Sequence, residues 1–356
     1  MNDGGPFPRV TFGIIVLNGE PFTRYCLRSI YPFAHQIVVV EGGHEDTRAV
    51  ATPDGHSVDG TLAELYRFKE EEDPLGKLEI VTRDGFWPKT DELGRHRTAQ
   101  SRAYAERATG DYLWQVDIDE FYLAEDMARV LALLRADPSI TTVSFRQKTF
   151  WARPAYEVDA WPLRRGQGVC HRVFRWGPGY RYVTHEPPTV VDERGRDLRT
   201  LHWVTPASHH LRGVYMYHYS LLFPWQVQQK ALIYRDEKPR AFSAMVDWYE
   251  HAYLRLERPY RIHNIYRTPG WLQRYRGEYP REVARMMADG AGGELPGGIR
   301  PVDDAERLLR AWWYPCGREA LKALDYLVRA REWSVRRLRR FAHALGIRRH
   351  GGDGGR

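Results

Sequence analysis

Apolar runs and amphipathic segments alternate along the first third of the chain. Residues 10–17 (VTFGIIVL) and 37–40 (IVVV) are continuous apolar runs rich in β-branched side chains, a pattern typical of strands buried on both faces. Between them, residues 22–30 carry apolar side chains at helical spacing. A strand, a helix and a second strand with short joints predict a right-handed βαβ unit in a parallel sheet.

The same alternation continues further along the chain. Strand patterns recur at residues 78–82, 112–116, 141–146, 169–175, 180–184 and 214–219, and helical patterns at residues 61–70, 96–108, 126–134 and 225–235. Beyond residue 239 the sequence is typical of helices and loops, and it includes a long basic helix at 305–345. These elements predict an α/β fold, with a Rossmann-like, mostly parallel sheet flanked by helices and a helical C-terminal extension.

Composition divides the chain into three segments. We expect a disordered N-terminus at 1–9, an α/β domain at 10–236, and a helical extension with a basic amphipathic tail at 237–356. No run of about 18 apolar residues occurs, so no transmembrane helix is expected, and residues 1–9 lack the apolar core of a secretory signal. Three cysteines match no metal or redox spacing and are expected to be reduced, buried thiols of a cytoplasmic protein: Cys26, Cys170 and Cys316.

Polar side chains cluster where the predicted strands end. After the first three strands these side chains are Asn18, Glu20, Glu41 and Asp84. The fourth strand runs directly into the acidic residues 117–120 (DIDE). Because ligands of open α/β sheets bind at the carboxyl ends of the strands, we expect these clusters to converge on one ligand site.

The acidic run indicates the chemistry of that site. In extended chain, Asp117 and Asp119 point to the same side, and two like charges side by side are costly without a cation between them. Carboxylate oxygens suit Mg²⁺ or Mn²⁺, which also bind phosphate oxygens. The run therefore predicts a divalent metal and a phosphate-bearing substrate. The alternative is a solvated acidic turn after a strand.

The chain is basic, with a formal net charge of +7. This balance is compatible with nucleic acid, anionic lipid or phosphorylated substrates as partners. Much of the excess lies at residues 329–349, where arginines surround Trp333, Leu338, Phe341 and Leu345. Such a helix either contacts an anionic membrane surface from the cytoplasmic side or is a solvated terminal helix. Outside the tail the arginines form no known motif, so no nucleic acid is expected.

Two stretches of the chain resemble a known group of enzymes. Residues 11–43 (TFGIIVLNGEPFTRYCLRSIYPFAHQIVVVEGG) and 99–121 (AQSRAYAERATGDYLWQVDIDEF) resemble the nucleotide-diphosphosugar glycosyltransferases of the GT-A fold, in particular the lipopolysaccharide-core branch of family 2. The resemblance extends over residues 10–235. The DIDEF and VVVEGGH forms are also similar to a family of β-1,4-N-acetylglucosaminyltransferases. The resemblance implies a nucleotide-diphosphate sugar as donor, Mn²⁺ or Mg²⁺ as cofactor, and a saccharide, lipid-linked or small-molecule acceptor.

The resemblance also implies roles for individual residues. Asp117 and Asp119 match the metal-binding pair of the Asp-x-Asp motif, and His218 is the candidate for completing the metal site. The candidates for holding the donor are Asn18, Glu20, Glu41, Asp84, Arg102 and Lys230.

Two of these donor candidates depart from the family pattern. Glu41 stands where the family has an aspartate that contacts the nucleoside, and it is one methylene longer. Ser101-Arg102 aligns with an Arg-Asn pair of the family. This alignment leaves Arg102 as a candidate phosphate contact.

An inverting transfer needs a carboxylate that takes the proton of the acceptor hydroxyl. Glu186, in the stretch 182–186 (YVTHE), is the candidate base. Its alternative is a structural carboxylate paired with Arg181 or Arg172. Glu120 is the other candidate catalytic carboxylate, and its alternative role is to support the metal loop.

Three functions compete at this point. The leading hypothesis is a metal-dependent hexosyltransferase in cell-envelope polysaccharide or glycoconjugate synthesis. The second is a metal-dependent nucleotidyltransferase or phosphoester hydrolase, although residues 18–21 (NGEP) lack the Gly-rich basic loop usual in nucleotidyltransferases. The third is a non-enzymatic basic nucleic-acid-binding protein.

Overall fold

The structure, a computed structural model, describes residues 7–88, 97–237, 245–264, 268–291 and 298–344. The chain divides into two compact units, Met1–Asp304 and Ala305–Arg356. The division therefore falls further along the chain than residue 236. Residues 1–6 of the predicted disordered segment, and the end of the tail after Ala344, lie outside the described residues. Within the described ranges, no helix is long and apolar enough to cross a membrane.

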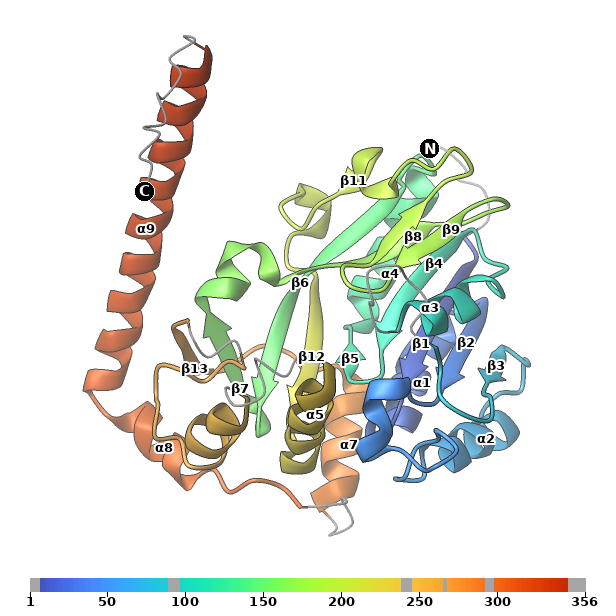
Figure 1. The fold of residues 1–356 in the computed structure, drawn as a ribbon, viewed down its shortest axis with the longest axis horizontal. Helices are drawn as coiled ribbons and strands as arrows, with labels where there is room; N and C mark the ends of the chain where they lie inside the picture. The colour runs from blue at the N-terminus through green and yellow to red at the C-terminus, as the bar shows by residue number, and fades with distance from the viewer. Residues whose placement is uncertain (1–6, 89–96, 238–244, 265–267, 292–297, 345–356) are drawn as a thin grey trace, which may run out of the picture. The chain divides into compact units, whose positions relative to one another are not determined.

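The predicted βαβ unit forms the centre of a parallel half-sheet. β1 (Val10–Val16) lies between β2 (Gln36–Glu41) and β4 (Tyr112–Asp117), and β3 (Leu78–Val81) pairs with the far edge of β2, all in parallel (Figure 1). α1 (Phe22–Ile30) connects β1 to β2. β1 and β2 are buried almost throughout, as their continuous apolar sequences predict for strands covered on both faces. The α/β fold class is confirmed.

The other half of the sheet is built from later strands. In the described residues the main path is β13-β7-β6-β8-β4-β1-β2-β3, with β5, β11 and β12 attached beside it. The bounds are β5 Glu120–Phe121, β6 Thr142–Trp151, β7 Arg153–Ala160, β8 Val169–Arg175, β11 Trp203–Val204, β12 Tyr215–Leu221 and β13 Gly270–Arg274. β8 pairs antiparallel with β4, whereas β12 runs parallel to β6. β9 (Arg181–Thr184) and β10 (Thr189–Val191) form a separate hairpin.

Five of these strands were not predicted from the sequence: β5, β10 and β11, which have two or three residues each, and the longer β7 and β13. β7 follows β6 after a single residue, so the two read as one aromatic stretch. β13 lies in the segment predicted to hold only helices and loops, yet it pairs antiparallel with β7. Its five residues are too few for a periodicity to be distinguished, and only the partner strand fixes their conformation.

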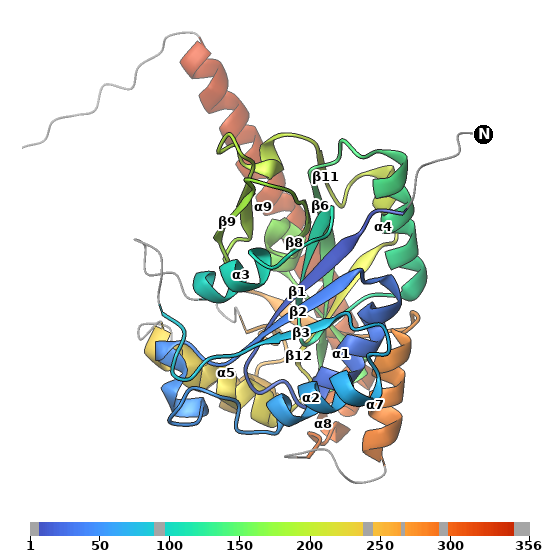
Figure 2. The ribbon, with the colours of Figure 1, turned by 90° about the vertical axis from the view of Figure 1, so that its right-hand side faces the viewer.

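Helices cover both faces of the sheet. The helices other than α1 are α2 Thr61–Glu71, α3 Thr98–Ala105, α4 Ala124–Ala136, α5 Pro224–Glu237, α7 Arg281–Ala291, α8 Asp303–Arg310 and α9 Trp313–Ala344. Short helical turns occur at Tyr31–Phe33, Glu45–Val50 (η2), Leu163–Gln167, Leu198–Thr200, His209–Leu211 and Tyr249–Leu254. Figure 2 shows α1, α4 and α7 on one side of the sheet and α3 and α5 on the other.

The core on the α1 and α4 side contains a stack of aromatic rings. The ring centroids of Phe12 and Trp114 are 5.3 Å apart, and those of Trp114 and Phe145 are 5.5 Å apart. All three side chains are buried. Each such ring pair stabilises the fold by about 0.5–1.5 kcal/mol beyond the burial of its area, so the packing fixes β4 at the centre of the sheet.

The cysteines match the expectation only in part. Cys26 is buried, Cys170 is half-buried, and Cys316 is exposed on α9. The expectation of a buried thiol is therefore wrong for Cys316, which lies on a helix that leaves much of its surface exposed.

Candidate active site

Asp117 and Glu41 lie on either side of the end of β1. In the parallel register, Ile15 is opposite Asp117 on β4, and Val16 is opposite Glu41 on β2. Since neighbouring strands are about 4.8 Å apart, the Cα atoms of the two acids are separated by about 10 Å. Both acids therefore lie at the carboxyl edge of the sheet, but Ile15 and Val16 are consecutive, so the register sets the two acidic side chains on opposite faces.

Arg172 on β8 binds two of the acidic residues. Its Nη2 donates to Oδ2 of Asp117 at 3.0 Å, and its Nε donates to Oε2 of Glu120 at 2.9 Å. Nη2 also bonds to Oε1 of Glu120, so the contact with Glu120 is bidentate. Glu120 in turn accepts a hydrogen bond from the backbone N–H of Asp117 at 3.2 Å. Arg172 and Glu120 are buried, whereas the Asp117 side chain is 34% exposed.

The charges of this cluster depend on one another. Burial acts to raise the pKa of Asp117, but Arg172, His185 and His218 outweigh it and hold that pKa well below its usual range. Burial raises the pKa of Glu120, with Arg172 opposing the change and the negative charge of Asp117 adding to it. Asp117 therefore remains a carboxylate that faces the solvent side of the cluster.

Asp119 is held by two side chains of the later half of the sheet. His218 Nε2 on β12 lies 3.5 Å from Asp119 Oδ1, and Gln226 Nε2 on α5 donates to Oδ2 at 3.0 Å. β12 pairs with β5 in a register that sets His218 opposite Glu120. The other ring nitrogen of His218 lies 2.9 Å from Nε2 of Gln147 on β6. The structure thus brings His218 to the acidic run across about a hundred residues of chain.

These donors fit one mode of binding a divalent metal. Among the described residues, no three His, Cys, Asp or Glu side chains converge on a common point. Mg²⁺ and ions like it are held by one or two protein carboxylates while waters and substrate phosphates complete the shell. Two carboxylates and an imidazole at the end of β4 supply that donor set. Oδ1 of Asp117 accepts no hydrogen bond from the described part of the chain.

Positive groups surround the carboxylates. Burial acts to raise the pKa of Asp119, but His218 and the Lys230 ammonium on α5 outweigh it and lower that pKa. Arg97 similarly lowers the pKa of Asp117. Burial, together with Lys230 and His218, lowers the pKa of His263 to about 3. Sequence reasoning missed Arg97 and His263, because neither belongs to a motif and the loop before β13 carries no pattern that leads back to the site.

Both carboxylate oxygens of Glu41 bind residues of the loop between β2 and α2. Its side chain is fully buried. Oε1 accepts from the backbone N–H of Ser57 at 2.8 Å, and Oε2 lies 2.9 Å from Nδ1 of His56. The predicted direct contact of Glu41 with a nucleoside is therefore not supported by its position. Glu41 holds the side chain of His56, and that side chain is 17% exposed at this edge of the sheet.

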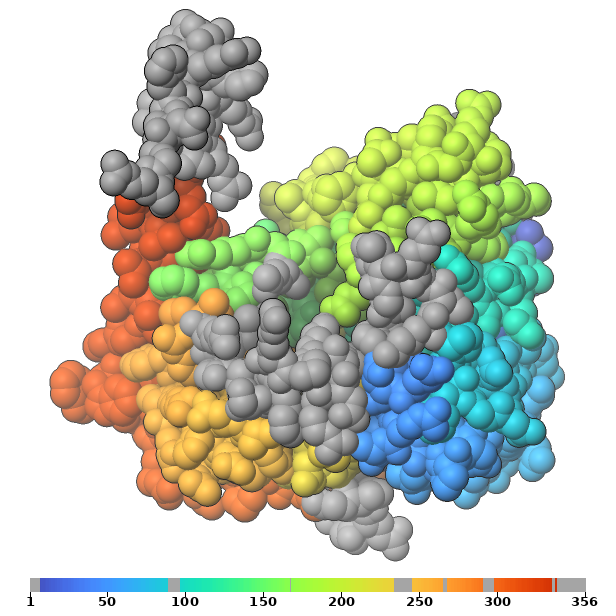
Figure 3. All heavy atoms as spheres, viewed as in Figure 1, coloured from blue at the N-terminus to red at the C-terminus, as the bar shows by residue number. Residues whose placement is uncertain are grey.

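Asn18 has the same structural role as Glu41. Its Nδ2 donates to the carbonyl of Val50 at 2.7 Å, and its Oδ1 accepts from the N–H of Val58 at 2.7 Å. Asn18 is buried. It therefore fixes the β2–α2 loop with both polar atoms of its side chain. Figure 3 shows this loop, in blue, at the molecular surface below the yellow-green residues that follow β8.

The other two acidic candidates differ in burial. Glu20 is half-buried at the start of α1, and burial, with Asp59 and Glu64 adding and Thr23 opposing, raises its pKa to about 7. Asp84 is exposed after β3. Its charge raises the pKa of His56, which places Asp84 near the same edge.

Arg102 binds the backbone of another element, whereas Glu186 is exposed. Arg102 Nε donates to the carbonyl of Tyr182 at 3.2 Å, so its guanidinium fastens α3 to β9. This contact speaks against the predicted phosphate contact. Glu186 is exposed in the turn between β9 and β10. Within the described residues it has no ion-pair partner, and the predicted alternative pairing with Arg172 is wrong because Arg172 binds Asp117 and Glu120.

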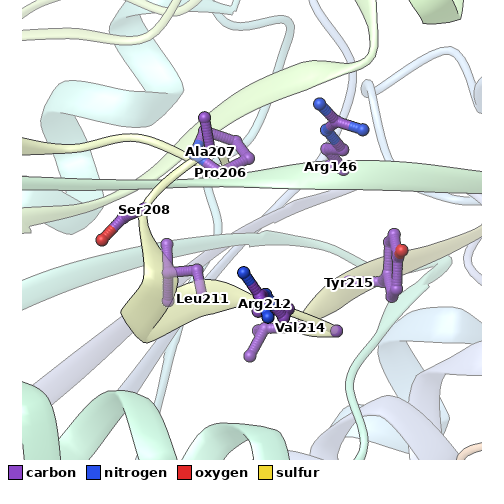
Figure 4. Close-up of a pocket in the computed structure, with 9 residues that line it drawn as sticks. Arg146, Pro206, Ala207, Ser208, Leu211, Arg212, Val214 and Tyr215 are labelled. Atoms are coloured by element: carbon purple, nitrogen blue, oxygen red, sulfur yellow. The ribbon is translucent and has the colours of Figure 1, made fainter.

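A separate pocket of about 220 Å³ lies where β12 begins. Figure 4 shows its lining, in which Arg146 on β6 and Tyr215 on β12 face residues of the preceding loop. The lining residues are Arg146, Pro206, Ala207, Ser208, Leu211, Arg212, Gly213, Val214 and Tyr215. None of them is a predicted site residue, so this pocket is not the acidic site.

Comparisons with known proteins give only distant likenesses. No protein-family model and no curated protein matches the chain. A crystal structure of TarS 1–349 from S. aureus is 12% identical and aligns over 71% of this chain and 74% of that chain, with a TM-score of 0.37. The mannosyltransferase PcManGT from Pyrobaculum calidifontis, in complex with GDP-Man and Mn²⁺, is 16% identical over 83% and 79%, with a TM-score of 0.37.

A third structure is glucosyl-3-phosphoglycerate synthase from Mycobacterium tuberculosis, in complex with Mn²⁺, UDP and phosphoglyceric acid. It is 15% identical over 40% of this chain and 43% of that chain, with a TM-score of 0.27. Likenesses with such low TM-scores carry no argument. The fold therefore rests on the sheet topology of this chain, and the function rests on its own site.

Proposed function

We propose that this protein is a metal-dependent glycosyltransferase of the GT-A type, which moves a sugar from a nucleotide-diphosphate donor to an acceptor hydroxyl. The observation that carries the proposal is the position of Asp117 and Asp119 at the end of β4, with His218 3.5 Å from Asp119. The resemblance of residues 10–235 to family 2 supports the same activity. We propose a cytoplasmic role in cell-envelope polysaccharide or glycoconjugate synthesis.

Asp117, Asp119 and His218 would hold Mn²⁺ or Mg²⁺. When bound, the metal would stabilise the negative charge that develops on the leaving nucleoside diphosphate. Arg172 keeps Asp117 ionised and fixes one of its oxygens, so the carboxylate needs no reorganisation when the donor arrives. The positive charge of Lys230 on α5 also favours the ionised form of Asp119.

Glu186 is the proposed general base. As the acceptor oxygen forms a bond to the anomeric carbon, the bond from that carbon to the phosphate oxygen breaks, and the hydroxyl proton passes to the Glu186 carboxylate. Its exposure in the β9–β10 turn leaves it accessible to an acceptor. Glu120 is buried against Arg172. That position favours support of Asp117 over contact with the acceptor.

A thermal-shift screen tests the proposal. The full chain is heated with UDP-, GDP-, dTDP- and CMP-sugars, each with and without Mn²⁺. We expect one nucleotide class to raise the melting temperature only with the metal, since a ligand at about 100 times its Kd stabilises the folded state by about 2.7 kcal/mol. Asp119→Asn should abolish the shift, while Asp137→Asn, a carboxylate on the exposed end of α4, should keep it.

The products separate the competing reactions. A glycosyltransferase releases a nucleoside diphosphate only when an acceptor takes the sugar. Pyrophosphate release would decide for a nucleotidyltransferase, and acceptor-independent phosphate release for a hydrolase. A metal-independent shift shared by all four nucleotides would contradict the metal site.

A further inference from the structure

Large exposed apolar side chains concentrate at the C-terminal helix. Among the described residues, Trp312 is 82% exposed, Leu327 63% and Trp333 60%, with Leu324 and Tyr326 also exposed. All five lie within or directly before α9. Several large exposed apolar side chains on one helix indicate an interaction surface.

The same helix carries most of the excess charge of the protein. Between Trp313 and Ala344 the sequence has eight Lys or Arg and three Asp or Glu residues, a net charge of +5 out of +7 for the whole chain. Asp325 is paired with Arg329 at 3.2 Å, and Glu319 with Lys322 at 2.7 Å. The acidic residues are thus partly neutralised locally, and the helix presents a basic surface.

The exposed leucines follow the helical period, while Tyr326 and Trp333 lie on the opposite side of the helix. Leu324 and Leu327 are three residues apart and therefore lie on one face, and both are exposed. The sequence repeats this pair as Leu338 and Phe341, 14 residues later, which is close to four full turns. Arg337 lies over the ring of Trp333, with 5.2 Å from its Cζ to the ring centroid. Aromatic rings beside arginines are typical of helices that lie in a membrane interface.

We propose that α9 binds the surface of an anionic lipid bilayer. The apolar stripe would enter the boundary between headgroups and acyl chains while the arginines contact anionic headgroups. A second copy of the same helix is a poorer occupant, because it would bring one charge of +5 against another. Nucleic acid would satisfy the arginines but would leave Leu324 and Leu327 in water. The proposal does not depend on the activity proposed above.

Vesicle sedimentation of the full chain tests this surface. We expect binding to phosphatidylcholine vesicles that contain a minority of phosphatidylglycerol, and little binding to phosphatidylcholine alone. Arg331→Gln with Arg337→Gln removes two exposed charges and should weaken binding about thirtyfold. Raising the ionic strength from about 0.1 M to about 1 M shortens the screening length from about 10 Å to about 3 Å and should also weaken it.

A second variant tests the apolar contribution. Leu324→Asp with Leu327→Asp should weaken vesicle binding at least about a hundredfold, because two leucines no longer leave water. The matched controls lie in the other compact unit: Leu75→Asp, a leucine that is 70% exposed, and Arg175→Gln with Arg194→Gln, two exposed arginines. These should leave binding unchanged.

Three results would overturn the proposal. The first is equal binding of the wild-type chain to neutral and anionic vesicles, or no binding to either. The second is unchanged binding by the Leu324→Asp, Leu327→Asp variant. The third is concentration-dependent dimerisation in analytical ultracentrifugation that this variant abolishes while vesicles remain unbound, which would assign the stripe to a second copy of the chain.

Discussion

Arg172 and Asp117 are joined by a hydrogen bond of 3.0 Å between Nη2 and Oδ2, although 55 residues separate them in the sequence. The contact exists because β8 pairs antiparallel with β4. The same guanidinium binds the buried Glu120. This arginine supplies positive charge to the two neighbouring carboxylates.

Removal of Arg172 should destabilise the fold strongly. Arg172→Ala leaves Glu120 buried without its partner, and breaking a buried ion pair in this way costs about 3–5 kcal/mol. The free energy of unfolding in urea measures the loss. Arg175→Ala removes an exposed arginine three residues further along the same strand and should change the stability by no more than about 0.5 kcal/mol.

A double replacement tests whether the stability lost in Arg172→Ala comes from the unpaired buried charge of Glu120. Arg172→Met with Glu120→Leu removes both charged groups, and we expect most of the lost stability to return, since an apolar pair of similar volume replaces a buried ion pair at little cost. Metal affinity should remain lower than in the wild type, because Asp117 loses its fixed orientation. Equal stability of Arg172→Ala and Arg175→Ala would contradict the buried pair.

Gln147 should control the metal affinity of His218. The amide nitrogen of Gln147 lies 2.9 Å from Nδ1 and donates to it, which leaves the ring proton on Nε2 beside Asp119. Ligation through Nε2 requires the proton on Nδ1, so this hydrogen bond opposes it. Gln147→Glu places an acceptor behind Nδ1 and should therefore raise Mn²⁺ affinity by about 10-fold or more, the usual size of the effect of a partner behind a ligand. Titration calorimetry of Mn²⁺ with the nucleotide measures it. Gln228→Leu, exposed on α5, should have no effect, and equal affinities of the two variants would refute the role of Gln147.

The pair of His56 and Glu41 predicts a pH-dependent contribution to stability. The hydrogen bond with Glu41 raises the pKa of His56 above its ordinary value of 6.5, burial opposes the change, and Glu41, Asp54 and Asp84 add to it by their charge. A raised pKa in the folded state means that the contribution is complete below pH 6.5 and is lost as the pH rises through the folded value.

Melting temperatures of the wild type and His56→Gln measure this difference. We expect the wild type to exceed the variant by more at about pH 6 than at about pH 8. His35→Gln replaces an exposed histidine and should not change the pH dependence. A difference that is constant with pH, or that grows toward high pH, would show that protonated His56 does not stabilise the loop.

Gly55 should be less tolerant of a side chain than Gly60. Both have a positive φ, +87° and +89°, which costs about 1–2 kcal/mol for a residue with a Cβ. A Cβ on Gly55 would also approach the backbone of Gly85 to 2.9 Å, whereas nothing lies within 4 Å of a Cβ on Gly60. Urea unfolding should therefore show a larger loss for Gly55→Ala than for Gly60→Ala. Equal losses would mean that the contact between the loops is not tight.

The early elements could be predicted because their signals are local. β1, α1 and β2 have apolar patterns of the right length, and the acidic run directly follows β4. β7 and β13 could not be predicted, because each is defined by the strand beside it and not by its own pattern. The predicted extension after residue 237 therefore includes an edge strand of the sheet.

In the candidate site, too, only features with a local sequence signal could be predicted. The sequence by itself determined where the carboxylates stand, since the acidic run follows an apolar strand; the period of two does not apply between them, because β4 ends at Asp117 and Asp119 lies in a turn. Only the tertiary structure decided what each carboxylate binds, because hydrogen-bond partners come from strands and loops far away in the chain. Glu41 shows the difference: its position at the end of β2 was predicted, but its burial against His56 turns an expected ligand contact into a loop anchor. Arg172 shows the converse: the sequence offered it only as a possible partner of Glu186, whereas pairing of β8 with β4 makes it the partner of the acidic run.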